Sequence, residues 1–301
     1  MKNFLKNNNQ IIKGIVSIFL LYTIFRKINI NQGIDYLSNV NYFYFILAIS
    51  LLVVHVLLKS FKWKLLINTE NSEVGIFDAM LSYMRGTAFA IITPARVGEL
   101  MRISNLKGNK LNLGLLVIVD KIVELLVVIV FAFWSIYIKF QNPLFLLILI
   151  VGVLCGVFAL FNLKKIDRFF PKIIKIEFAR KIINGLKLVS SDILTKVFVL
   201  SFLTMLIFFL QAYLLLLSFG FGNLVVVFLV FPIILLTNLI PITIGGFGIR
   251  EGSASFLLSF YAVPIPVSVV VVLCLYLFDT IIPGICGSVA FSFKSRIDEV
   301  A

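Results

Sequence analysis

The sequence is poor in the residues from which metal centres and disulfide frameworks are built. It has one histidine, His55, and three cysteines, Cys155, Cys274 and Cys286, each inside an apolar segment. None of these residues has metal-ligand spacing, and no serine, histidine and aspartate form a nucleophilic set. The chain also lacks the Gly-x-x-x-x-Gly-Lys loop that binds nucleotide phosphates. We therefore expect no metal, no cofactor and no direct use of ATP, and we do not expect an enzyme.

Apolar residues, in contrast, make up 61% of the 301 positions, whereas about 45–50% is usual in soluble domains. This composition predicts an all-α polytopic membrane protein. The apolar run near the N-terminus has no small-residue cleavage site after it, so we interpret it as a retained span and not as a signal peptide. Full spans are predicted at residues 11–25, 42–58, 113–138, 143–163, 193–219 and 266–293.

The net charge of +13 is distributed around the apolar runs and does not form one soluble patch. This pattern is typical of cytoplasmic loops beside anionic lipid and argues against nucleic-acid binding. The most basic stretch, 164–192, has apolar residues at helical spacing, so it is predicted to be a cytoplasmic amphipathic segment on the membrane surface. Recognition of an acidic partner is the other reading of this stretch. The orientation predicts a multi-pass protein of the cell membrane with both termini cytoplasmic.

Two segments, 74–102 and 224–262, break the apolar pattern with a proline followed by glycine, arginine and glutamate. The first contains TPARVGELMR from Thr93, and the second contains PITIGGFGIRE from Pro241. A charge at the centre of a bilayer costs about 2.5–3.5 kcal/mol on insertion scales, so such residues usually face a protein interior or a water-filled cavity. Two broken, charged segments in corresponding halves predict a binding site near the membrane midplane.

The predicted fold is therefore a single transmembrane domain, 1–301, with six full transmembrane helices and two re-entrant broken-helix hairpins. The first three spans and their hairpin run in the opposite sense to the last three. This predicts an inverted repeat of residues 1–139 and 140–301. The alternative is eight spans, if each hairpin crosses the membrane.

The candidate binding residues of the first half are charged: Arg96, Glu99, Arg102, Asp120, Lys121 and Glu124. The three residues of the hairpin are spaced by three, so they are neighbours on a helix. Asp120 and Glu124 are four apart and share one helix face, from which we expect them to face Arg96, Arg102 or another cation. A purely structural ion pair is the alternative.

The candidates of the second half are Gly245, Gly246, Gly248, Arg250 and Glu251. A helix that begins near Gly248 would present free amide groups and a positive dipole end to an anion such as phosphate. Arg250 adds positive charge there, and Glu251 offsets part of it. We predict that Arg96 and Arg250 form one anion site from the two hairpins.

His55 lies inside the second predicted span. This span is expected to end at Leu58, before Lys59, Lys62 and Lys64, with Trp63 as an interfacial anchor. The histidine could titrate or bind a ligand, but a hydrogen-bonded structural histidine is the more frequent case. Coupling to protons through His55, Asp120 or Glu124 is a further reading of the same residues.

Together the motifs resemble the membrane region of lysylphosphatidylglycerol synthases and the free-standing flippase-like proteins related to them. TPARVGELMR resembles the first family motif at Pro94, Arg96, Gly98 and Glu99. VDKIVELL resembles an Asp-Arg-x-x-Asp span, with Lys121 and Glu124 as like-charge replacements. IPITIGGFGIREG resembles the second motif, from Pro241 to Glu251. The last span departs from the family, because LYLFDTIIPG has Tyr276 and Asp279 where members often carry an arginine before the proline.

The resemblance implies movement of a membrane lipid between leaflets. The bifunctional synthases carry a soluble aminoacyl-transferase domain after their spans, and this sequence does not, so lysyl transfer is not expected. The predicted substrate is an anionic or zwitterionic lipid: a phospholipid, aminoacylated or not, or a polyprenyl-phosphate-linked lipid. The alternative is a non-transporting subunit that scaffolds a lipid or glycan synthase. A homodimer and such a synthase partner are both left open.

Overall fold

The computed structural model describes residues 19, 22–23, 26, 35–70, 74–144, 147–148, 151–152, 184–237, 243 and 246–290. These residues form helices, and no strand occurs among them, which confirms the all-α prediction. Helices at Tyr42–Ile67 (α3), Ser191–Ser218 (α9) and Ile265–Ala290 are long and apolar enough to cross a membrane. Most of the predicted spans 11–25 and 143–163, and most of the segment 164–192, lie outside the described residues.

Helix α3 continues through the lysines that were predicted to end it. It begins after Asn41, whose side chain accepts from the Phe43 N–H, and it ends at Ile67. Trp63 is completely buried, and its Nε1 donates to Ser82 Oγ at 2.9 Å. The prediction of an interfacial tryptophan after a span ending at Leu58 is therefore wrong. The helix continues because acidic residues elsewhere in the fold hold Lys62 in the interior.

The segment 74–102 forms the predicted broken hairpin. Helix α4 (Ile76–Ile92) ends at Thr93, which is extended, and a 3₁₀ helix, η1 (Pro94–Ile103), follows. The two packed halves leave no space for a side chain at Gly98. A Cβ there would lie 2.2 Å from the Phe89 carbonyl oxygen, and the Gly98 N–H donates to Thr93 Oγ1 at 2.7 Å. The second short helix that the sequence predicted is therefore present. It is a 3₁₀ helix, in which side chains three residues apart are aligned.

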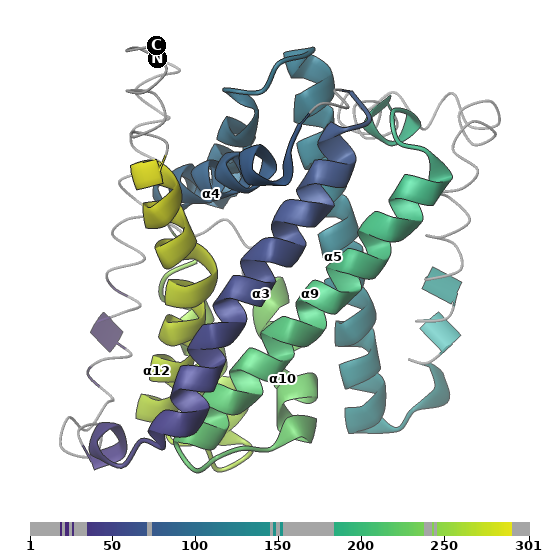
Figure 1. The fold of residues 1–301 in the computed structure, drawn as a ribbon. Coiled ribbons are helices and arrows are strands. Elements are labelled where there is room, and N and C mark those ends of the chain that lie inside the picture. Colours follow the sequence, from purple (N-terminus) through teal and green to yellow (C-terminus); the bar gives the residue numbers. More distant parts are fainter. Residues whose placement is uncertain are drawn as a thin grey trace, which may run out of the picture.

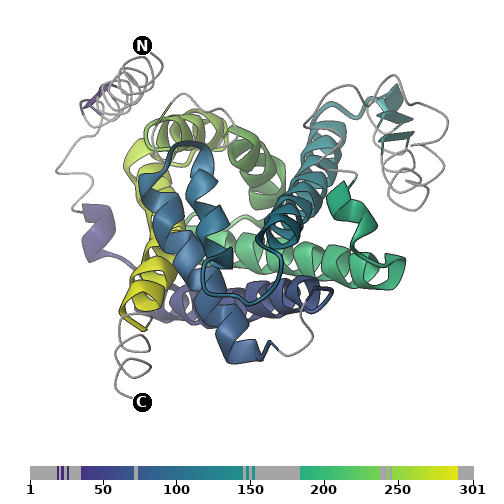
Figure 2. The same ribbon diagram turned by 90° about the horizontal axis from the view of Figure 1, so that it is seen from above.

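Four further helices pack beside α3, α9 and one another. They are α5 (Lys110–Phe140), α10 (Leu224–Thr237), α11 (Ile249–Ser259) and α12 (Ile265–Tyr276). A π-helical turn, η3 (Leu277–Ile281), continues α12, and the helix then runs to Ala290, so the last span lies close to the predicted 266–293. Seen from above, α5 and α12 lie on opposite sides, and α10 and α11 lie across from α3 (Figure 2).

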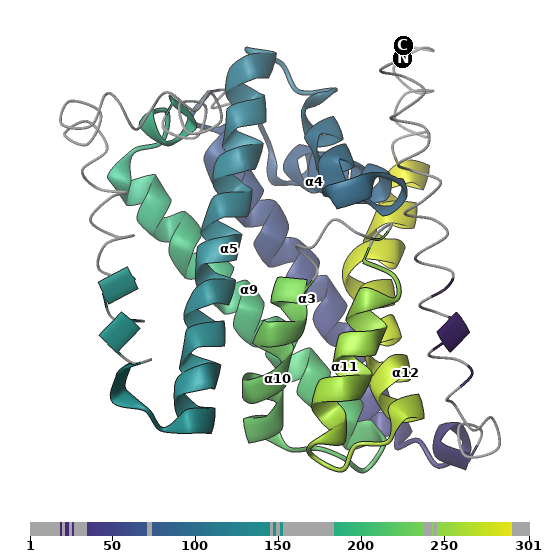
Figure 3. The same ribbon diagram turned by 180° about the vertical axis from the view of Figure 1, so that it is seen from behind.

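The two broken segments approach the middle of the fold from opposite ends. Figure 1 shows α4 near the end where α3 finishes, whereas Figure 3 shows α10 and α11 near the end where α5 finishes. Two buried apolar clusters support this arrangement. One includes Phe209, Leu215 and Phe231, and the other includes Trp63 and Leu116. Four charged residues of the broken segments are therefore buried in a packed interior: Glu99, Arg102, Arg250 and Glu251.

Candidate functional site

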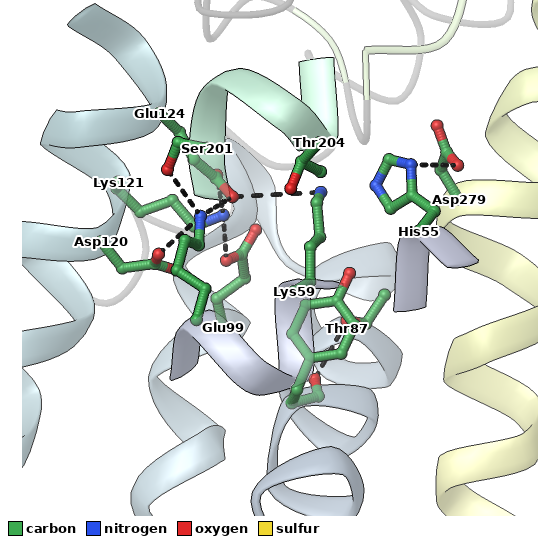
Figure 4. A network of polar contacts seen from close by, with 12 residues as sticks. His55, Lys59, Thr87, Glu99, Asp120, Lys121, Glu124, Ser201, Thr204 and Asp279 are labelled. Atoms are coloured by element: carbon green, nitrogen blue, oxygen red, sulfur yellow. Dashed lines mark hydrogen bonds and ion pairs between the residues drawn. The ribbon is translucent and has the colours of Figure 1, made fainter. Parts of the chain in front are cut away.

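A network of buried ion pairs joins α3, η1 and α5. Lys62 Nζ lies 2.8 Å from Asp120 Oδ1 and 2.7 Å from Glu124 Oε1, and its side chain is 1% exposed. The two carboxylates share one face of α5, as their spacing predicted. They meet a lysine of α3 as well as cations of the hairpin and of α5. Figure 4 shows this group of residues from close by.

Arg102 is the most enclosed cation of the hairpin. Its guanidinium group lies 2.8 Å from Asp120 Oδ2 and 2.6 Å from Glu99 Oε2. Its guanidinium carbon lies 5.0 Å from the centre of the Tyr83 ring and 5.6 Å from that of Trp63. With both acids and both rings in place, Arg102 joins η1 to α3, α4 and α5. This packing favours a structural role for Arg102.

Glu99 pairs with three cations of the network, of which Arg102 has been described. Its Oε2 lies 2.6 Å from Lys121 Nζ, and its Oε1 lies 2.9 Å from Arg96 Nε. Lys121 also lies 2.8 Å from Glu124 Oε2. The predicted neighbours Arg96–Glu99 and Glu99–Arg102 are thus confirmed. Each acid of the network has at least two cationic partners, which offsets the cost of burying it.

A cavity of about 120 Å³ opens beside this network. Its apolar wall comes from α9, α10 and α12. Its charged and polar lining consists of His55, Lys59, Arg96, Glu124, Ser201, Thr204, Arg250, Tyr276, Asp279 and Thr280. The two hairpins therefore each bring an arginine to one cavity. Glu124 belongs to both the cavity and the network, and the other predicted charged residues of the first half lie in the network behind the cavity: Glu99, Arg102, Asp120 and Lys121.

Arg96 is the most exposed cation of the network, ahead of Lys121, whose side chain is 37% exposed. Its side chain is 46% exposed, and its backbone φ is 55°. A positive φ is unfavourable for a residue with a long side chain, so the surrounding hairpin must hold it. Such strain often occurs at functional sites. The conformation turns a residue of η1 to the cavity while the rest of the helix remains in the network.

The second hairpin presents Arg250 but uses its own acid at the helix start. Helix α11 begins after Gly248, whose φ is 89°, and the Gly248 N–H donates to Glu251 Oε2 at 2.6 Å. Glu251 is fully buried, and its Oε1 lies 2.9 Å from Arg250 Nη2. The helix was predicted to offer free N-terminal amides to an anion. This prediction is wrong for the Gly248 amide, because that amide already donates to Glu251. Gly246 is described, whereas Gly245 and Pro241 lie outside the described residues.

Several residues of the cavity were not among the predicted site residues, among them Lys59, Tyr276 and Asp279. Lys59 was assigned to the end of a span, but its Nζ lies in the cavity, 4.0 Å from Glu124 Oε1. Tyr276 packs against the Arg250 guanidinium carbon, which is 4.0 Å from the ring centre. Asp279 lies near His55. An acid inside an apolar span was the available signal for Asp279, since such residues are rare without a function.

The fold and the cavity define a helical membrane protein with an intramembrane polar site built where broken helices meet. Over residues 10–287 the chain matches the family described as the Lysylphosphatidylglycerol synthase TM region, and it therefore belongs to this family. Neither a comparison with curated proteins nor one with solved structures found a match. The family confirms the resemblance that the motifs indicated, and it associates the chain with lipid handling in a membrane.

Proposed function

We propose that this protein is a lipid translocase of the cell membrane. Its substrate would be a phospholipid, aminoacylated or not, or a polyprenyl-phosphate-linked lipid that moves between the leaflets. The observation that carries the proposal is that Arg96 and Arg250, from two separate hairpins, line one cavity. Arginine suits phosphate because its planar guanidinium offers two parallel donors. Transport, and not catalysis, is the proposed activity. The polar lining offers cations for binding, and among the described residues no serine hydroxyl hydrogen-bonds to His55 as a nucleophile would.

The other predicted site residues have supporting roles in this proposal. Glu99, Asp120, Lys121 and Glu124 hold the first hairpin, and Glu251 holds the second. Apolar side chains such as Phe208 and Leu235 form the wall opposite the charges. A cavity with one charged side and one apolar side suits a molecule with an anionic headgroup and acyl chains.

The proposed topology has six spans, two re-entrant hairpins in an inverted repeat, and both termini in the cytoplasm. Single cysteines, placed in a background without native cysteines, test it. Cysteines at Asn142 and Gly222 should react with an impermeant reagent from outside, and one at Lys187 only after permeabilisation. Thr69 and Lys107 flank the first hairpin, and both should react only after permeabilisation. If one of these two reacts from outside, the hairpin crosses the membrane and the eight-span alternative holds.

Reconstitution of the purified protein tests translocation directly. Vesicles of phosphatidylcholine with a trace of fluorescent phosphatidylglycerol are treated with an impermeant quencher. A translocase should expose the probe of the inner leaflet, so nearly all fluorescence should be lost. Vesicles with an unrelated multi-pass protein are the control and should retain the inner-leaflet signal. If the protein behaves like this control with phosphatidylglycerol, with an aminoacylated phospholipid and with a polyprenyl phosphate, the scaffold alternative is favoured.

A further inference from the structure

A buried histidine and aspartate face each other at the cavity without any of the partners that hold the other charges. His55 Nδ1 lies 3.3 Å from Asp279 Oδ1, and the two side chains are 4% and 13% exposed. Figure 4 shows the pair on the far side of Lys59 from Glu124 and Asp120. Among the described residues, no hydrogen bond of good geometry reaches either nitrogen of His55 or Oδ1 of Asp279. The reading of His55 as a hydrogen-bonded structural histidine is thus wrong within the described chain.

The acids of the network differ from Asp279 because each of them lies close to at least two cations. Asp120 lies within 2.8 Å of Lys62 and Arg102, and Glu124 lies within 2.8 Å of Lys62 and Lys121. Protonation of either carboxylate would remove one negative charge that pairs closely with two cations, which is costly in a packed interior. The reading that coupled Asp120 or Glu124 to protons is therefore disfavoured. A proton that binds to the His55–Asp279 pair breaks no such ion pair.

The position of the pair also suits a transport step. At 1.5 Å per residue, His55 lies about 20 Å from the start of α3, and Asp279 lies about 20 Å from the start of α12. Both residues are thus near the middle of helices long enough to cross a membrane. Asp279 lies in the π-helical turn η3, and π-helical turns are rare and frequent at functional sites.

The charges around the pair determine whether it binds a proton when the cavity is empty or when it holds an anion. The charged and titratable groups near the pair are Lys59 and Lys62 from α3, Arg96 from η1, Glu124 from α5, Arg250 from α11 and Tyr276 from α12, and Tyr83 from α4 lies near Lys59. The polar residues from α9, Ser201 and Thr204, carry no charge. The cavity cations disfavour an additional positive charge on the pair while the cavity is empty of anions. A phosphate that neutralises these cations removes this obstacle.

We propose that the His55–Asp279 pair is a proton-binding site and that an anionic headgroup enters the cavity together with one proton. The proton goes to the pair as a unit, which holds one more proton in the occupied state than in the empty state. Because binding takes up a proton, affinity rises as the pH falls. By linkage, lipid occupancy raises the proton affinity of the pair by the same factor by which protonation raises the affinity for lipid. This inference rests on the proposed function, and it names the ion that would accompany the lipid.

Calorimetry of the full-length protein in detergent tests the inference. The probe is a short-chain phosphatidylglycerol, because its phosphodiester does not titrate around pH 6.5, the ordinary range of histidine. Titrations in two buffers with different heats of ionisation count the protons taken up on binding. Near pH 6.5 we expect the protein to take up about one proton for each lipid bound. The affinity for the probe should fall by up to about tenfold for each unit rise in pH.

The variants His55→Gln and Asp279→Asn should bind the probe without this proton uptake. They lie on different helices, so either of them suffices if the other fails to fold. The matched control is Asp192→Asn, which removes an exposed carboxylate at the start of α9 and should keep the uptake. Binding by the parent without a proton, or unchanged uptake in a folded variant, overturns the inference and leaves the proposed function standing. Absence of binding at every pH overturns the anion site and the inference with it.

Discussion

Replacement of Arg96 or Arg250 by glutamine should weaken binding of an anionic phospholipid by roughly ten- to a hundred-fold. Each change removes one hydrogen bond between a charged donor and phosphate, worth about 1.5–3 kcal/mol. Arg96→Lys and Arg250→Lys should recover only part of the loss, because lysine cannot form the paired contacts of a guanidinium. Binding of a short-chain phosphatidylglycerol to the detergent-solubilised variants measures the effect.

The matched control for these variants is Lys196→Gln. Lys196 is 58% exposed and is paired with Asp192 at the start of α9, so its loss removes the same formal charge outside the cavity. It should leave lipid affinity unchanged. Arg250 also pairs with buried Glu251, so each variant needs a check that it remains monodisperse. If both glutamine variants stay folded and bind like the parent, the two arginines are structural and the anion site is wrongly assigned.

Lys62→Met should cause the largest loss of stability among single changes in the network. The lysine is buried and compensates Asp120 and Glu124 at once. Removal of one partner of a buried ion pair costs about 3–5 kcal/mol, because the remaining charge stays buried without its partner. The free energy of unfolding, measured in mixed micelles with increasing dodecyl sulfate, should fall by about this amount.

Two comparisons separate this effect from a general loss of charge. The double variant Lys62→Met with Glu124→Gln removes one charge of each sign and should regain much of the lost stability, since Glu124 no longer carries the buried charge that Lys62 compensated. Lys196→Met breaks an exposed pair and should cost less than about 1 kcal/mol. Equal stability of Lys62→Met and the parent would show that the buried network does not hold α3, η1 and α5 together.

Local patterns in the sequence determined the membrane class, the broken first hairpin and its ion pairs. The apolar excess requires a hydrocarbon environment, and Pro94 cannot continue α4. Arg96, Glu99 and Arg102 are neighbours at a spacing of three in any helical geometry. The family followed from the same strings, because Pro94, Gly98 and Glu99 occur together with the charges of α5. These features depend only on residues that are close in the chain, so they could be read before the fold was known.

The tertiary structure decided which charges line the cavity and which are buried behind it. Lys59 and Lys62 have the same sequence signature as lysines at the end of a span, yet one lies in the cavity and the other in the network. The distinction depends on α5 and η1, which approach α3 from distant parts of the chain. The contact between His55 and Asp279 joins residues more than two hundred positions apart, and no local pattern records it. Burial determines which charges need partners, and only the packed helices determine which partners are within reach.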